Sequence, residues 1–146
     1  MYQSILVPFD GSSFAEEALR LANYLGNDSE ATIYLLGVTE LLPAGDELGR
    51  LAVGVSPMEP DREGLEKVVR EELEQAWAKL DNPKAHPEFI VSWGQPARAI
   101  VSEAEKNAVE VIVMGSRGLS NLQALAVGSV SHKVMHVAPC RVITIH

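Results

Sequence analysis

The amino-acid sequence predicts an α/β fold: one domain, residues 1–146, with an open, mostly parallel five-stranded sheet and helices on both faces. Three observations predict this fold. The length of 146 residues is about the usual size of one compact domain. Strand-like and helix-like segments alternate along the chain, as they do in β-α-β units. The strand-like runs are almost continuously apolar, which is typical of a sheet that helices cover on both faces.

The first three elements follow from short-range patterns. A short apolar run at 4–7, closed by Pro8, predicts the first strand. Apolar residues recur at helical spacing over 14–25, with charged residues on the opposite face, and Gly26 is a plausible end for this helix. An apolar, β-branched run at 31–38 predicts the second strand.

The later elements repeat the same alternation. A long amphipathic stripe predicts a helix over 65–80, which Pro83 ends. The remaining expected elements, in chain order, are a strand over 88–93, a helix over 97–104, a strand over 111–114, a helix over 130–137 and a strand over 141–145.

Residues 40–64 interrupt this alternation with three prolines, four glycines and six acidic residues. Connections longer than about 12–15 residues are uncommon and are usually mobile or functional. We expect a mobile segment here. It is either an insertion without a role or a lid or partner-binding loop over the carboxyl ends of the strands.

Composition excludes several classes of function. The net charge of −8 argues against binding to nucleic acid or to an anionic membrane surface. The apolar runs are too short to span a membrane, and the first residues lack a signal peptide, so we expect a cytoplasmic protein. The single cysteine, Cys140, cannot form an internal disulfide, and no Cys/His group has the spacing of a zinc site. We expect no metal site made by the protein itself.

The charge is unevenly distributed. Residues 111–146 contain no acidic residue and three basic ones, whereas 1–110 contain all 20 acidic and nine basic residues. Such a stretch in an acidic chain is consistent with an anion-binding site. It is equally consistent with a segment that is largely buried and therefore lacks surface acids.

The segment between the first strand and the first helix contains Asp10, Gly11 and Ser12. Glycine suits the turn and Ser12 can cap the helix. Asp10 then stands at the end of a strand, where ligands bind in parallel α/β sheets. From the residues alone, Asp10 is either a turn residue or a ligand of the site.

A stronger pattern follows the fourth expected strand. Gly115 and Gly118 end that strand, and Gly128 and Ser129 come at the start of the next expected helix. Glycines let a backbone approach a phosphate closely, and a helix N-terminus offers unpaired N–H groups and positive potential. Arg117 adds a cation. No P-loop, dinucleotide fingerprint or nucleophile elbow is present in the sequence.

This pattern resembles the phosphate motif of the universal stress protein family, specifically of its ATP-binding branch. The family motif is Gly, two residues, Gly, nine residues, Gly, then Ser or Thr, and the chain matches it without departure. Segments 5–12 and 138–142 look like the two ends of the family, so the resemblance covers essentially the whole chain. One departure is Arg141, where many members have a second proline. The resemblance implies a Rossmann-like, adenine nucleotide α-hydrolase-like fold.

The resemblance also implies a site for ATP, with Mg²⁺ or Mn²⁺ held mainly by phosphate oxygens and water. The implied residues are Pro8, Val38 and Met114 beside the adenine, Asp10 beside the ribose, and Gly115, Arg117, Gly118, Gly128, Ser129, Val130 and Ser131 around the phosphates.

We therefore expect an ATP-binding stress-response or signalling module that changes conformation or partners with its nucleotide state. The partner protein is unknown. A slow Mg²⁺-dependent ATPase is one alternative, and a related fold that binds flavin or another adenine nucleotide is another. We expect no catalytic residue, because no carboxylate is evident beside the expected γ-phosphate.

The last expected strand, 141–145, is apolar, and members of the family commonly pair this strand with a second copy of the chain. Both points predict a homodimer through that strand. His132 and His136 are expected on the helix surface or at an interface, and Cys140 as a buried small residue.

Overall fold

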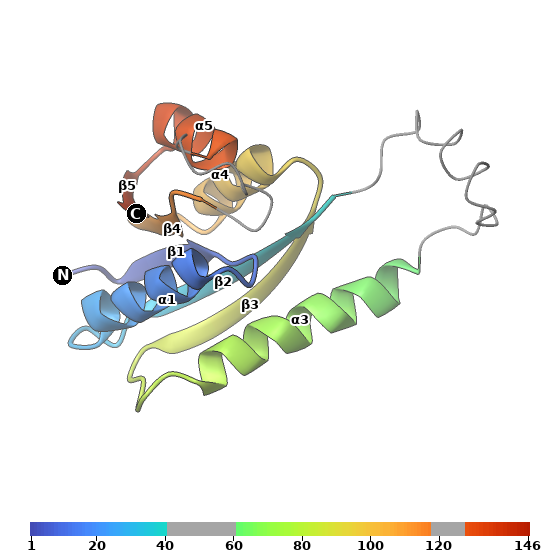
Figure 1. Ribbon diagram of the computed structural model, residues 1–146. Coiled ribbons are helices and arrows are strands. Elements are labelled where there is room, and N and C mark those ends of the chain that lie inside the picture. The colour runs from blue at the N-terminus through green and yellow to red at the C-terminus, as the bar shows by residue number, and fades with distance from the viewer. Residues whose placement is uncertain (41–60, 118–127) are drawn as a thin grey trace, which may run out of the picture.

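The structure, a computed structural model, describes residues 1–40, 61–117 and 128–146. Strands and helices alternate through these ranges, as Figure 1 shows. In chain order they are β1 (Ser4–Pro8), α1 (Ser13–Gly26), β2 (Thr32–Thr39), α3 (Arg62–Ala78), β3 (His86–Trp93), α4 (Pro96–Lys106), β4 (Val111–Gly115), α5 (Ser129–Val137) and β5 (Arg141–Ile145).

All five expected strands and all four expected helices are present, with small differences at their ends. α3 begins at Arg62, inside the segment expected to be irregular, because the carboxylate of Asp61 caps it by accepting the Gly64 N–H at 3.0 Å. β3 begins at His86, two residues before the apolar run, since the His86 N–H donates to the Ala31 carbonyl. The expectation of a mobile segment at 40–64 falls mostly on residues 41–60, which lie outside the described ranges.

The five strands form one sheet in the order β3-β2-β1-β4-β5, and every neighbouring pair is parallel. The prediction of a mostly parallel five-stranded sheet is therefore confirmed. β1 lies between β2 and β4, so the chain winds outward from β1 in one direction and then from β4 in the other. The carboxyl ends of β1 and β4 are the point at which strand order reverses, where doubly wound sheets bind ligands.

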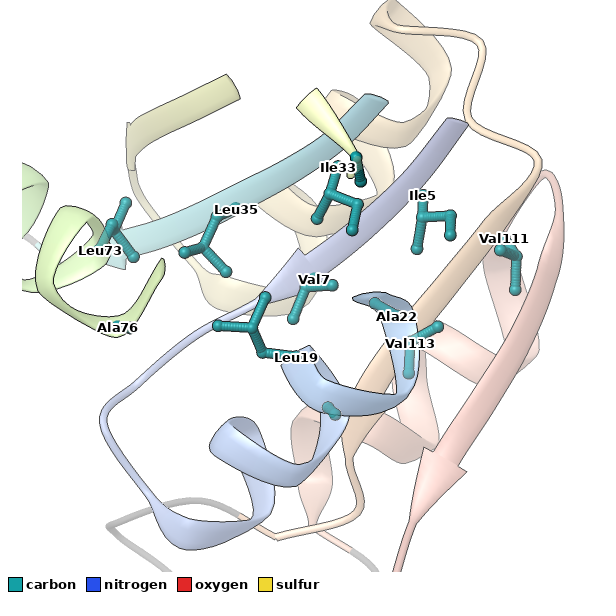
Figure 2. Close-up of a cluster of buried hydrophobic side chains, with 12 residues drawn as sticks. Ile5, Val7, Leu19, Ala22, Ile33, Leu35, Leu73, Ala76, Val111 and Val113 are labelled. Atoms are coloured by element: carbon teal, nitrogen blue, oxygen red, sulfur yellow. The ribbon is translucent and has the colours of Figure 1, made fainter. Parts of the chain in front are cut away.

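Alternate residues of the strands supply two separate cores, one on each face of the sheet. On one face, Ile5 and Val7 of β1 pack with Leu19 of α1 and Leu73 of α3; Figure 2 shows these side chains between the helices and the strands. On the other face, Leu6 of β1 belongs to the cluster that includes residues of α4 and α5. Helices thus cover both faces of the sheet, as predicted. No helix in the described ranges combines the length and the apolar character needed to span a membrane.

Candidate functional site

A cavity of about 500 Å³ opens at the carboxyl edge of the sheet, where β1, β2 and β4 end. The first turns of α4 and α5 complete its walls. The residues expected at the site that line it are Pro8, Asp10, Val38, Met114, Gly115, Arg117, Gly128, Ser129, Val130 and Ser131. Gly118 lies outside the described residues. The fold thus brings together residues from three separate parts of the sequence.

The turn from β1 into α1 is held by its own side chains. The Ser12 N–H donates to Asp10 Oδ1 at 2.9 Å, and Ser12 Oγ accepts the Ala15 N–H at 3.2 Å, which caps α1. Gly11 between them has a φ of 83°, a conformation that glycine adopts without strain. Asp10 therefore is a turn residue, as one interpretation held, and it also lines the cavity, as the other requires.

Gly115 serves a purpose that the sequence motif does not reveal. A Cβ atom at this position would lie 2.7 Å from Phe14 Cβ and 3.0 Å from the Arg117 carbonyl oxygen. The first turn of α1 can pack against the end of β4 only because the side chain is absent. Gly115 is not among the described glycines with a positive φ. A glycine is therefore needed here for steric room and not for its backbone conformation.

Ser116 joins the ends of the segment that the motif spans. Its N–H donates to the Ile145 carbonyl at 2.8 Å, which extends the pairing of β4 with β5. Its carbonyl accepts the Gly128 N–H at 2.6 Å and Ser131 Oγ at 3.0 Å. Ser116 and Ser131 are both buried, with exposed fractions of 2% and 1%. These bonds fix the start of α5 beside the end of β4.

The N-terminus of α5 is the part of the cavity best suited to an anion. Gly128 occupies the cap position and has no side chain with which to bond the first amides. The helix therefore leaves the N–H groups of Ser129, Val130 and Ser131 without carbonyl partners of its own. No acidic residue lies in the first turn, and Arg117 adds positive charge to the wall of the cavity. Backbone donors, the positive end of the helix dipole and a basic residue thus line the same cavity.

The two serines of this turn have different surroundings. Ser129 occupies the first helical position, after the cap residue Gly128. The Ser131 hydroxyl is within 3.0 Å of both the Ser116 and the Gly128 carbonyls, so its proton is used inside the protein. Lys133, the other cation near the motif, is exposed on α5 and does not line the cavity.

Sequence reasoning missed several residues of the wall. Thr39 and Glu40 come at the end of β2, so the rule that ligands bind at carboxyl ends could have found them. Thr39 Oγ1 is buried and has no hydrogen-bond partner. Ile100 enters from α4, and no local pattern marks it. The other missed residues are Phe9, Ala15, Leu36, Pro96 and Ser116.

The fold and the cavity define a class of protein: a doubly wound parallel α/β domain with a ligand cavity at its switch point. The model of the universal stress protein family matches residues 1–146, and the chain belongs to this family. Within the described residues, no group of three or more His, Cys, Asp or Glu side chains could hold a metal ion.

Relatives support this assignment along their whole length. Universal stress protein YxiE of Bacillus subtilis is 31% identical over 147 residues, which cover 99% of each protein. The solved structure of the Methanocaldococcus jannaschii protein MJ0577 has a TM-score of 0.79 at 26% identity, covering 99% of this chain and 96% of that one. A universal stress protein from Archaeoglobus fulgidus, solved in complex with dAMP, has a TM-score of 0.67 at 22% identity, covering 99% and 98%. The last similarity shows a shared fold.

The hydrogen bonds of Ser131 predict a contrast with Ser129 on the same helix. Replacing Ser131 with Ala leaves the buried carbonyls without this donor and should lower the free energy of unfolding by about 1–2 kcal/mol. Ser129→Ala should change it by less than about 0.5 kcal/mol, as substitutions away from such contacts do. Urea unfolding followed by circular dichroism measures both. Equal losses in the two variants would contradict the structural role of Ser131.

Proposed function

We propose that this chain is an ATP-binding stress-response or signalling module that changes its conformation or its partners with the state of the nucleotide. The observation that carries the proposal is the N-terminus of α5, which presents unpaired amides to the cavity beside Arg117. Phosphates bind such helix ends. The complex of the Archaeoglobus fulgidus protein with dAMP supports an adenine nucleotide as the ligand class.

In this proposal the nucleotide lies along the carboxyl edge of the sheet. The adenine contacts the apolar wall made by Pro8, Val38 and Met114, and the ribose lies near Asp10. The phosphates then occupy the end of the cavity between Arg117 and the first turn of α5. The proposed phosphate ligands are Gly115, Arg117, Gly118, Gly128, Ser129, Val130 and Ser131, with Ser131 contributing its backbone, since its hydroxyl is already bonded.

The carboxylates in the described wall of the cavity are Asp10 and Glu40. Asp10 Oδ1 already accepts the Ser12 N–H. A hard cation that accompanies ATP would therefore be held mainly by phosphate oxygens and water, which suits Mg²⁺ or Mn²⁺.

A matched pair of charge removals tests the ATP site. Arg117→Ala removes a guanidinium that lines the cavity, whereas Lys133→Ala removes an exposed cation of α5 that does not. Loss of a charged hydrogen bond costs about 1.5–3 kcal/mol, so Arg117→Ala should weaken ATP binding by roughly tenfold or more. Lys133→Ala should leave it within about twofold, because an exposed charge outside the site contributes little.

Isothermal titration calorimetry of both variants with ATP, ADP and AMP decides the question. ATP is expected to bind most tightly. Equal affinities for ATP and AMP would contradict the assignment to ATP while leaving an adenine-nucleotide site. Equal losses in Arg117→Ala and Lys133→Ala would contradict the phosphate position itself.

A slow ATPase is the second candidate, and its rate is the test. Single-turnover hydrolysis with Mg²⁺ should be far below the ~1–100 s⁻¹ of dedicated kinases, because fixed amides and a cation bind ground state and transition state almost alike. Arg117→Ala should reduce both binding and any residual hydrolysis. A wild-type rate inside that range, lost in Asp10→Asn while ATP binding is retained, would make the protein an enzyme.

The two edges of the sheet differ in a way that supports a homodimer through β5. On the β3 edge, Pro87 has no N–H to offer, and Arg70 Nη1 covers the Phe89 carbonyl at 3.0 Å. Such features prevent an edge strand from pairing with another chain. β5, by contrast, contains no proline. The Ile145 carbonyl bonds toward β4, through the Ser116 N–H.

Alternate residues of a parallel strand bond the same neighbour, so Val142 and Thr144 point their backbone groups away from β4. Val142→Pro therefore removes an outward donor and should convert the dimer to a folded monomer. Ile143→Pro, one residue on, removes a donor to β4 and should destabilise the fold. Light scattering gives the mass and circular dichroism the fold. A wild-type monomer, or a dimer of Val142→Pro, would contradict this interface.

A further inference from the structure

The exposed side of α5 has two histidines that the nucleotide site does not use. His132 and His136 are four residues apart, and both are exposed. Their ring centres are 4.5 Å apart, with the ring planes at 76°. Residues at this spacing lie on one face of a helix, separated by only about 40° around its axis. Two histidines at this spacing supply two of the ligands of known zinc sites on helices, although the described residues contain no larger group of metal ligands.

We propose that His132 and His136 chelate one divalent transition-metal ion, such as Zn²⁺, Ni²⁺ or Cu²⁺, on the surface of α5. A metal about 2.1 Å from one nitrogen of each ring lies about 3.2 Å from each ring centre. Two bound rings then have centres roughly 4.5–5.2 Å apart for angles of about 90–110° at the metal. The observed edge-to-face pair has centres 4.5 Å apart, so the two rings already lie within reach of one ion. Both rings are solvent-exposed, so each can turn about its Cβ–Cγ bond to aim a nitrogen at the ion without disturbing the core.

The ligand atoms and the lack of carboxylates nearby in the sequence favour a transition-metal ion over Ca²⁺ or Mg²⁺. Neutral imidazole suits Zn²⁺, Cu²⁺ and Ni²⁺, whereas Ca²⁺ and Mg²⁺ require oxygen ligands. Residues 111–146 contain no Asp or Glu, so α5 and its neighbours in sequence supply no carboxylate beside the histidines. The site is separate from any Mg²⁺ that accompanies a nucleotide, because neither histidine lines the cavity. Water completes the coordination of an ion held by two side chains.

Chelation has a structural consequence. The four-residue spacing brings the imidazoles together only while residues 132–136 are helical, so the metal binds the folded state in preference to the unfolded chain. Such binding raises the stability of the protein in proportion to the logarithm of metal concentration. The metal joins adjacent turns of a nine-residue helix that begins at the cavity and ends at Val137.

Moving one histidine tests the spacing without changing the number of histidines. The double variant His136→Gln, Val137→His places the second imidazole five residues from His132, about 140° away around the helix. Val137 is 61% exposed and ends the helix, so the fold should tolerate the change. His86→Gln removes a histidine of β3 outside the proposed site, and Cys140→Ser removes the one thiol; both are controls.

Calorimetric titration of untagged, nucleotide-free protein with Ni²⁺ should give one ion per chain in the wild type. The affinity should fall by about tenfold or more in His132→Gln, His136→Gln and the double variant, because even the loss of a group that only orients a ligand costs about tenfold. It should be unchanged in both controls. Ni²⁺ should raise the melting temperature of the wild type and not that of the double variant. Absence of wild-type binding, or equal affinity in the double variant, would overturn the proposal.

Discussion

The placement of the α5 N-terminus depends on the backbone of Ser116. Its N–H is bonded to the end of β5, and its carbonyl to both the cap residue and the third residue of α5. One residue thus connects the end of β4, the edge strand and a helix N-terminus. These bonds hold the end of β4 directly against the start of α5, so the helix begins beside the switch point. The hydroxyl of Ser131 strengthens this arrangement from inside the helix.

The first turns of α1, α4 and α5 all lie at the cavity, and the side chains of α1 and α5 make those two helix N-termini different. At α1, Ser12 caps the helix, Asp10 accepts the Ser12 N–H, and Glu16 adds a negative charge in the first turn. The cap bonds one of the free N–H groups of that helix, and the negative charge offsets the positive end of its dipole. At α5, a glycine cap and an acid-free first turn leave the amides and the dipole uncompensated. An anion that enters the cavity is therefore drawn toward α5 rather than toward α1. This asymmetry supports placing the phosphates there and the sugar near Asp10.

The sequence predicted the order and type of the elements because each carries a strong local pattern: apolar runs for buried strands and amphipathic stripes for helices. The glycine motif, the turn at Asp10 and the resemblance to the family together predicted ten of the eighteen residues that line the cavity. The sequence could not show why residue 115 must be glycine, because the side chain that a Cβ there would contact, Phe14, lies far away in the chain. The role of Ser116 could not be predicted because its backbone, which every residue type has, makes the hydrogen bonds. Ile100 escaped because a wall residue on α4 has the same helical spacing as a core residue.

The same geometry bears on whether the protein holds or hydrolyses a nucleotide. Donors that contact a phosphate equally in the ground state and in the transition state strengthen binding without accelerating phosphoryl transfer. Rate enhancement requires in addition a group that orients water or accepts its proton. Of the carboxylates in the described wall, Asp10 is engaged by the turn that precedes α1, where its Oδ1 accepts the Ser12 N–H. In the proposed function, a site built in this way would favour retention of the nucleotide over its hydrolysis, and a retained nucleotide could act as a signal.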